Sequence, residues 1–401
     1  MFNSLKFKVI LFGFIFTFFS SFGQSYFLGI FNSSIRETLS ITHGQFGSIY
    51  ASATLCSSLL LIWVGKKIDD VNVFKFALFV IILLSFACFF FSKVSSVLLL
   101  FIGIFLMRFS GQGMMSHTAS TTISRYFTKT RGRALSINWI GLSSAEFILP
   151  VLMVYLLTII DWQNLWIIFS ITVLIVLPIT SFLLIKNLNL DSREAIDENI
   201  KQVEIKQWKR KEVIKDYRFY IISLNMLAMP WIFSGFAVFQ SFVQTSKGWG
   251  PYLIAQSFMS YSIFSVLTLF LSGFLIDKFT SRKLLIYMNI PLLLAAIILF
   301  FFDTPIIAFI FLGLVGSSNG FANILGSSTW AELYGVKYLG SIKALSTALM
   351  VFATAFGVAL FGFLIDIGFS VGDIAAVSGI YIFISLILLF LIRKRLNPVL
   401  I

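Results

Sequence analysis

Apolar stretches of about 20 residues, long enough to cross a hydrocarbon core as helices, follow one another along almost the whole chain. They centre on residues 8–31, 44–64, 73–93, 96–123, 134–160, 163–186, 217–243, 251–276, 283–302, 305–329, 341–365 and 374–392. Few charged residues interrupt them, and most of the polar segments between them are short. The pattern predicts an all-α integral membrane protein with 12 transmembrane helices.

One hydrophilic segment is long, and it lies near the middle of the chain, at residues 187–216. It carries charges of both signs and has a basic cluster at residues 209–211. It divides the chain into a predicted N-terminal six-helix bundle, residues 1–186, and a predicted C-terminal six-helix bundle, residues 217–401. We interpret the segment as a cytoplasmic connector loop, with a regulatory or partner-binding role as the alternative.

Two short motifs occur twice, about half a chain apart. The sequence GKKID at residues 65–69 is matched by GFLID at residues 273–277, each after a long apolar stretch. The sequence RALS at residues 133–136 is matched by KALS at residues 343–346. One membrane module written twice gives two pseudo-symmetric halves, which is the usual plan of a secondary transporter with its substrate site between the halves.

The composition excludes a soluble protein. Hydrophobic residues make up 58% of the chain and charged residues only 12%, against roughly 25% charged in soluble domains. The net charge of +13 could suggest nucleic-acid binding, but its distribution argues against that partner. With both termini in the cytoplasm, every Lys and Arg lies in a cytoplasmic segment except Arg36, Lys93, Lys247 and Arg108. This asymmetry predicts a multi-pass protein of the cell (inner) membrane, with membrane lipid as its surroundings.

Catalytic and cofactor motifs are missing from the sequence. It has no Gly-rich Lys-Ser/Thr loop for ATP, no metal-spaced His/Cys cluster, and only two histidines, His43 and His117. We therefore predict that the protein is not an enzyme and binds no cofactor or metal. Its expected partner is a small-molecule substrate, and we expect a monomer.

The spans, the central connector and the repeated Gly-x-x-x-Asp loop resemble the major facilitator superfamily over essentially the whole chain. The resemblance implies a cytoplasmic latch in which the two Asp side chains bind helix ends and the two Gly residues allow helices to approach closely. The latch residues would be Gly65, Asp69, Gly273, Asp277 and Arg282. The first copy departs from the family pattern, with Asp70 in place of a basic residue and Asn72 in place of glycine.

A polar stripe is predicted on the fourth span. Arg108 lies near the middle of this span, where a charge normally faces a cavity or a partner, and Gln112 and Ser116 follow at helical spacing. The repeat places Asn319 and Asn323 at the corresponding positions of the tenth span. In the resembled fold these two helices line the central cavity; helix–helix hydrogen bonding is the alternative.

Other substrate-binding candidates lie on the first and seventh spans, where an aromatic-belt or packing role is the alternative. They are Gln24, Tyr26, Asn225 and Trp231.

Glu146 is an acid deep inside the fifth span, at about the depth of Arg108. Two hypotheses remain open for this residue. In one, Arg108 and Glu146 form a structural ion pair that fixes helix packing. In the other, Glu146 carries a proton while an anionic substrate occupies Arg108, which gives proton-coupled symport.

The function that we predict is secondary active transport by alternating access. The substrate would be a small organic anion such as a carboxylate, because Arg108 is a cation deep in a span. The sequence style resembles the bacterial monocarboxylate and oxalate/formate branch. Two alternatives are an exporter of hydrophobic or amphiphilic compounds and a transporter-like membrane sensor or scaffold.

Overall fold

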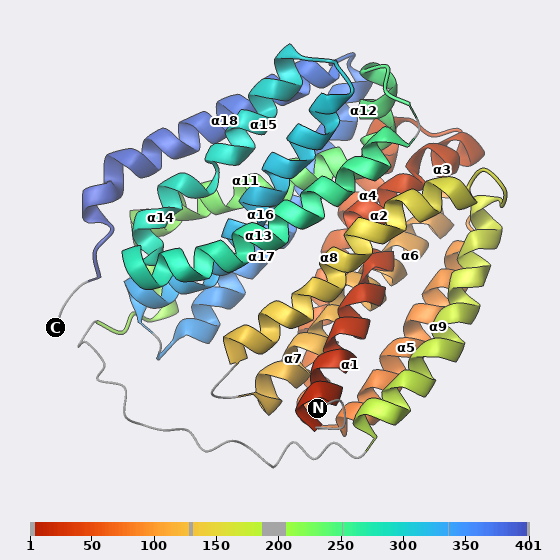
Figure 1. Ribbon diagram of the computed structural model, residues 1–401, viewed down its shortest axis with the longest axis horizontal. Helices are drawn as coiled ribbons and strands as arrows, with labels where there is room; N and C mark the ends of the chain where they lie inside the picture. Colours follow the sequence, from red (N-terminus) through yellow and green to blue (C-terminus); the bar gives the residue numbers. More distant parts are fainter. Residues whose placement is uncertain (1–4, 128–130, 187–205, 251, 336, 399–401) are drawn as a thin grey trace. The chain divides into compact units, whose positions relative to one another are not determined.

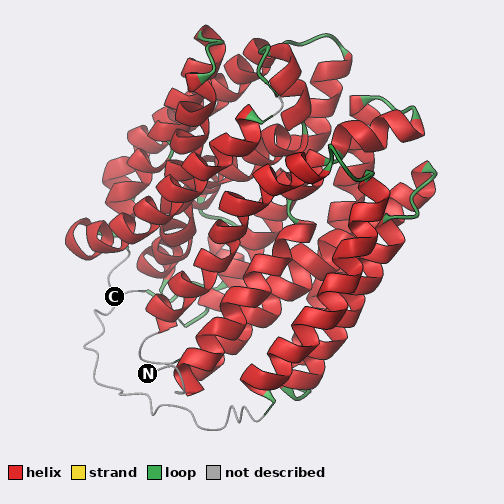
Figure 2. Cartoon of the chain, turned by 45° about the vertical axis from the view of Figure 1, so that its right-hand side comes forward, coloured by secondary structure: helices red, strands yellow, loops and turns green. Residues whose placement is uncertain are grey.

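The computed structural model describes residues 5–127, 131–186, 206–250, 252–335 and 337–398. Within these ranges the chain is helical and contains no strand (Figure 2). Twelve helices are long and apolar enough to cross a membrane, which confirms the predicted all-α membrane architecture. The chain divides into two compact units, Met1–Glu198 and Asn199–Ile401, which are considered one at a time below.

The N-terminal unit contains six spans, and two of them are interrupted. In the first, α1 gives way to a 3-10 turn at Ser21–Gly23, and in the fourth a π-helix at Arg108–Met115 separates α6 from α7. The helices are α1 (Leu5–Ser20), α2 (Ser25–Ile30), α3 (Asn32–Leu39), α4 (His43–Gly65), α5 (Val73–Phe91), α6 (Val97–Met107), α7 (Ser116–Tyr126), α8 (Arg131–Leu156) and α9 (Trp162–Ile185).

The C-terminal unit also contains six spans, and the third of these is divided at Asn289. Its helices are α10 (Arg210–Val213), α11 (Tyr217–Val238), α12 (Gln240–Ser246), α13 (Leu253–Phe279), α14 (Ser281–Met288), α15 (Ile290–Phe301), α16 (Ile306–Tyr334), α17 (Leu339–Asp366) and α18 (Val371–Ile392).

Polar side chains fix where several spans begin. The Thr42 hydroxyl accepts a hydrogen bond from the Gln45 N–H, and the Gln45 side chain accepts one from the Thr42 N–H, which forms a capping box at the start of α4. The Asn72 side chain accepts hydrogen bonds from the N–H groups of Phe74 and Lys75 at the start of α5. Asn72, at the position where the family pattern has glycine, is thus the N-cap of the next helix.

The two units pair their spans in the same order. In the N-terminal unit α1 packs on α8, α4 on α6, and α5 on α9, and the last pair lies side by side in Figure 1. In the C-terminal unit α11 packs on α17, α13 on α16, and α15 on α18. In both units the first span thus pairs with the fifth, the second with the fourth, and the third with the sixth, as expected for a duplicated module.

Part of the predicted connector packs on the C-terminal unit. Residues 187–205 lie outside the described ranges, but residues 206–216 do not form a free tether. The Trp208 N–H donates to the Tyr334 carbonyl oxygen at 3.0 Å, and the two rings are 5.4 Å apart. The Gln207 side chain accepts a hydrogen bond from the Lys337 N–H at 2.9 Å. The C-terminal bundle therefore begins before residue 217, because an aromatic ring in the connector packs on its helices.

Candidate functional site

Two glycines bring the interruption of the first span against the π-helix of the fourth. A Cβ atom on Gly23 would lie 2.3 Å from the Met107 carbonyl oxygen, and one on Gly111 would lie 2.6 Å from the Gly23 nitrogen. Only glycine leaves room for backbones this close. π-Helical segments inside α-helices are frequent at functional sites, and this one begins at Arg108.

Arg108 is buried, with 2% of its surface exposed. Part of its guanidinium is hydrogen-bonded within the N-terminal unit, whereas Nε has no hydrogen-bond partner among the described residues. Its Nη1 donates to the Gly23 carbonyl oxygen at 2.9 Å and lies 3.4 Å from Ser25 Oγ. Its guanidinium carbon lies 5.2 Å from the centre of the Tyr50 ring, an arrangement that a cation favours. The helix break frees carbonyl groups from helical hydrogen bonding, and the Gly23 carbonyl accepts from Arg108.

The ion-pair hypothesis for Glu146 does not hold in this structure. No ion pair or hydrogen bond joins Glu146 to Arg108 or to any other described residue. Glu146 is 5% exposed, and its electrostatic neighbour is Tyr26 on α2. The physical reason is that the Arg108 guanidinium turns toward the break in the first span, where it finds neutral oxygen acceptors.

The predicted polar stripe on the fourth span is not a regular helical stripe. Arg108 and Gln112 lie in the π-helix and Ser116 lies directly after it, so α-helical spacing does not apply between them. Arg108 is buried, whereas Gln112 and Ser116 are half-buried. Gln24, in extended conformation between the 3-10 turn and α2, is half-buried on the neighbouring span.

A cavity of about 280 Å³ opens within the C-terminal unit between α11, α16 and α17. Asn319 and Asn323, both predicted as site residues, line it together with Lys343. Asn319 Nδ2 donates to Ser265 Oγ on α13 at 2.9 Å, which orients the amide. The remaining lining is hydroxyl, thioether and apolar: Ser223, Met226, Leu227, Met229, Pro230, Phe233, Ala322, Gly326, Trp330, Ser346, Thr347, Leu349 and Met350.

The other two candidates of the C-terminal unit, Asn225 and Trp231, do not line this cavity. Asn225 Nδ2 lies 3.4 Å from Ser385 Oγ on α18, and the Trp231 ring lies 5.1 Å from the Tyr381 ring of the same helix. The structure therefore places both in helix packing. The backbones of α11 and α17 also lie close together at Trp231, because a Cβ on Gly357 would lie 2.0 Å from the Trp231 carbonyl oxygen.

The first latch loop is held by side chains of α7. His117 Nε2 forms a 2.9 Å hydrogen bond with the Gly65 carbonyl oxygen, and Arg125 Nη1 donates to the Ile68 carbonyl oxygen at 3.1 Å. A Cβ on Gly65 would lie 3.3 Å from His117 Nε2, so this side chain of α7 packs directly on the glycine. The side chain of Asp69 lies outside the described part of the structure.

The second latch loop has more open surroundings than the first. The Asp277 side chain is also outside the described part, and a Cβ on Gly273 would meet no described atom within 4 Å. Within the C-terminal unit, this face of α13 therefore has room for a side chain, and the close helix approach assigned to Gly273 stays a prediction.

Glu332, at the end of α16, organises the second loop, and the sequence analysis missed it. Its carboxylate oxygens accept hydrogen bonds from the N–H groups of Ser281 at 2.8 Å and Arg282 at 3.3 Å, at the start of α14. An acid is favourable at a helix N-terminus. Arg282 Nη1 donates in turn to the Leu396 carbonyl oxygen at 3.2 Å and to Asn397 Oδ1 at 3.0 Å.

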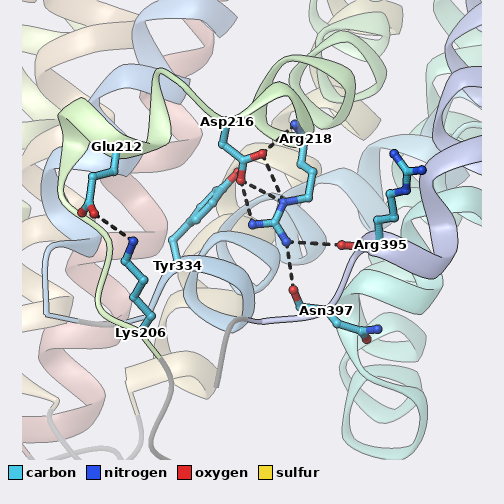
Figure 3. A network of polar contacts seen from close by, with 7 residues as sticks. All are labelled: Lys206, Glu212, Asp216, Arg218, Tyr334, Arg395 and Asn397. Atoms are coloured by element: carbon cyan, nitrogen blue, oxygen red, sulfur yellow. Dashed lines mark hydrogen bonds and ion pairs between the residues drawn. The ribbon is translucent and has the colours of Figure 1, made fainter. Parts of the chain in front are cut away.

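A second network, also missed, joins four segments of the C-terminal unit (Figure 3). Asp216 caps α11 and binds the Arg218 guanidinium at 2.8 Å, and it accepts a hydrogen bond from the Tyr334 hydroxyl at 3.1 Å. Arg218 also donates to the carbonyl oxygens of Arg395 and Asn397. Nearby, the Lys209 N–H and the Lys206 side chain hold the pKa of the exposed Glu212 carboxyl below its usual range. The network ties the connector's end to α16 and to the segment after α18.

The contacts of Arg108 predict that this side chain contributes to the stability of the fold. Arg108→Gln should lower the free energy of unfolding by roughly 1–3 kcal/mol, because a shorter neutral amide leaves the Gly23 carbonyl without its donor. Thermal melting in detergent would measure this, with the exposed Arg133→Gln as the control that should melt like the wild type. A wild-type melting temperature in Arg108→Gln would contradict the structural role.

Comparison with known proteins identifies the family. The Major Facilitator Superfamily matches residues 13–349. The solved structure of a bacterial homologue of the human lysosomal transporter Spinster, in an inward-facing and occupied conformation, superimposes with a TM-score of 0.71 at 14% identity, covering 97% of this chain and 96% of that chain. The nucleoside transporter NupG gives a TM-score of 0.70 at 14% identity, covering 98% and 99%. No curated protein sequence matches. The family match spans most of the chain and agrees with the fold, and we conclude that the protein is a member of the major facilitator superfamily.

Proposed function

We propose that this protein is a secondary active transporter that moves a small organic anion across the cell membrane by alternating access. Membership of the family supports transport of a small solute. The observation that carries the choice of an anion is Lys343, which lines the cavity of the C-terminal unit beside Asn319 and Asn323. A carboxylate is the anion that the resemblance to the monocarboxylate and oxalate/formate branch favours.

The physical argument rests on how the cavity is lined. Lys343 is half-buried and has no ion pair with another described residue, so its charge is available to a ligand. A charge-assisted hydrogen bond to an ammonium group is about twice as strong as a neutral one. The Asn319 and Asn323 amides and the Thr347 hydroxyl can hydrogen-bond the rest of the solute. The Arg108 guanidinium already contacts Gly23, Ser25 and Tyr50. We therefore propose that Arg108 positions the first span and does not bind the substrate.

The N-terminal unit contributes further candidates to this proposal. Ser116 Oγ is buried and has no hydrogen-bond partner among the described residues, and Gln112 is half-buried one turn away. Both can bind solute, as can Gln24 and Tyr26. We assign proton coupling to Glu146, because a buried carboxyl without an ionic partner can gain or lose a proton during transport.

The proposal includes the latch and the topology. Asp69 and Asp277 close the cytoplasmic side of the transporter in one state of the transport cycle. The protein is a monomer in the inner membrane of the cell, and both of its termini face the cytoplasm. The Lys and Arg asymmetry supports this orientation.

Lys343→Gln tests the proposed substrate site. A thermal-shift screen of the purified protein against organic acids, amino acids, nucleosides and amphiphilic cations first identifies a ligand. We expect an organic acid to stabilise the wild type, and Lys343→Gln to bind it at least about tenfold more weakly, since a charged hydrogen bond contributes roughly 1.5–3 kcal/mol.

The matched control is Lys337→Gln, an exposed lysine near the start of the same helix, which should bind like the wild type. Uptake of the identified acid into proteoliposomes should be lower for Lys343→Gln than for the wild type and Lys337→Gln. Organic-acid binding that is equally strong in Lys343→Gln would refute the assignment of Lys343.

Export of amphiphilic compounds is a second candidate, favoured by one observation. Met226, Met229 and Met350 line the cavity with the Trp330 ring, and flexible thioethers adapt to varied apolar ligands. Stabilisation by amphiphilic cations and not by organic acids would support this candidate over anion transport.

A further inference from the structure

A second, basic cavity lies at one end of the C-terminal unit, apart from the cavity discussed above. It has a volume of about 630 Å³ and is formed where α13 ends, α14 begins and α18 ends. Three cations line it, Arg282, Lys283 and Arg393, and no acidic residue is among its lining residues. These helix ends belong to the side of the membrane that the Lys and Arg distribution predicts to be cytoplasmic.

Arg282 forms a fixed wall of this cavity. Its Nη1 binds Leu396 and Asn397, and its Nε lies 3.9 Å from Glu332 Oε2. Its charge is therefore partly compensated, and its hydrogen bonds hold the segment after α18 against the start of α14.

Lys283 and Arg393 are the cations that a ligand can reach. Both are exposed, and neither forms an ion pair with a residue in the described ranges. The Arg393 guanidinium lies 3.5 Å from the centre of the Phe390 ring, which orients it without neutralising it. Two uncompensated cations beside one cavity favour an anionic ligand.

Apolar surface continues from the cavity along the spans. Phe279 and Tyr287 line the cavity itself and are exposed. Farther along the same helices, Phe274 is 76% exposed and Leu391 is 70% exposed, as expected for side chains that contact lipid chains. The surface is thus cationic at the helix ends and apolar next to them, which matches an amphiphile with an anionic head.

The opposite ends of α15 and α18 provide an internal comparison. A cavity of about 410 Å³ there is lined by apolar and aromatic side chains such as Leu293, Phe300 and Phe383. None of the residues that line it is charged. The cations therefore lie at the start of α14 and at the end of α18, and the other cavity along α18 has none.

We propose that the basic cavity binds the phosphate headgroup of an anionic glycerophospholipid from the cytoplasmic leaflet. Lys283 and Arg393 contact the phosphate, and the acyl chains lie along the exposed apolar faces of α13, α14 and α18. Basic pockets between helices at the cytoplasmic side of a membrane suit such headgroups. A free phosphate ion could use the same cations, but it would gain nothing from the apolar faces beside them.

Thermal melting of the delipidated protein in detergent tests this proposal. Phosphatidylglycerol should raise the melting temperature more than phosphatidylcholine at equal concentration. The double variant Lys283→Gln/Arg393→Gln should lose this difference and bind phosphatidylglycerol about 25-fold more weakly, about fivefold for each cation removed. Native mass spectrometry of the lipid adducts would measure the affinity directly.

Two control variants and two comparisons of ligands decide the outcome. Lys66→Gln/Lys67→Gln, which removes two exposed lysines after α4, should keep the preference for phosphatidylglycerol, and so should the charge-conserving Lys283→Arg/Arg393→Lys. Equal stabilisation by the two lipids, or an equal loss of preference in the lysine control, would overturn the site. Stabilisation by inorganic phosphate as large as that by phosphatidylglycerol would overturn the lipid as its ligand.

Discussion

Glu146→Gln is expected to bind and exchange substrate but to lose accumulation driven by a pH gradient. The amide has the shape and hydrogen-bonding groups of the protonated acid, and it cannot release a proton. Glu146 is buried and has no hydrogen bond or ion pair with another described residue, so the substitution breaks neither kind of interaction. We expect counterflow close to that of the wild type and uptake under an imposed pH gradient at the background level, both measured in proteoliposomes.

The control for this experiment is Glu37→Gln, which removes an exposed carboxylate of α3 and should leave both activities unchanged. The structure also predicts the stability of the double variant at Glu146 and Arg108. Because no ion pair joins them, adding Arg108→Gln to Glu146→Gln should not restore stability, as it would if each single variant left a buried charge unpaired. Uptake that still follows the pH gradient in Glu146→Gln would exclude Glu146 as the coupling residue.

Gly23→Ala and Gly111→Ala are each expected to destabilise the N-terminal unit by about 3 kcal/mol, the upper end of the usual cost of overpacking. The added methyl group on Gly23 would lie 2.3 Å from the Met107 oxygen and 2.4 Å from the Gln112 nitrogen, and both are backbone atoms that cannot rotate away. The first span would have to move off the π-helix, and the Gly23 carbonyl would move away from Arg108. Thermal melting and the yield of monodisperse protein in detergent would report the loss.

Gly273→Ala is the matched control, since its methyl group would meet no described atom within 4 Å. Its stability should stay the same or rise by up to about 1 kcal/mol, because alanine favours a helix more than glycine does. Gly111→Ala and Gly273→Ala with equal melting temperatures would show that the close backbone contact does not contribute to stability.

The spans could be predicted from the sequence because hydropathy depends on residue type alone. The apolar stretch at residues 73–93, for example, corresponds to α5, which ends at Phe91. The interruptions could not be located in the same way. The π-helix at Arg108–Met115 depends on Gly23 of another span meeting Gly111, and hydropathy contains no information about such a contact.

The repeat in the sequence pointed to two candidate residues that lie together in the structure. Asn319 and Asn323 came from their match to the fourth span, and both line the cavity of the C-terminal unit. Asn225 and Trp231 were candidates because they are an amide and an aromatic residue on the seventh span, and they pack against α18. Glu332 was missed because its role depends on the start of α14, which lies about 50 residues earlier in the chain and approaches it only in the folded unit.

The positions of the Arg108 partners in the sequence affect how the fourth span can insert into the membrane during synthesis. A charge at the centre of a span opposes insertion by roughly 2.5–3.5 kcal/mol on translocon scales. Gly23, Ser25 and Tyr50, which surround the guanidinium, all precede Arg108 in the chain. Synthesis runs from the N-terminus, so every acceptor of this charge has left the ribosome before the charge itself does. The fourth span therefore need not enter the bilayer as an isolated charged helix, because the first two spans are already available to receive its arginine.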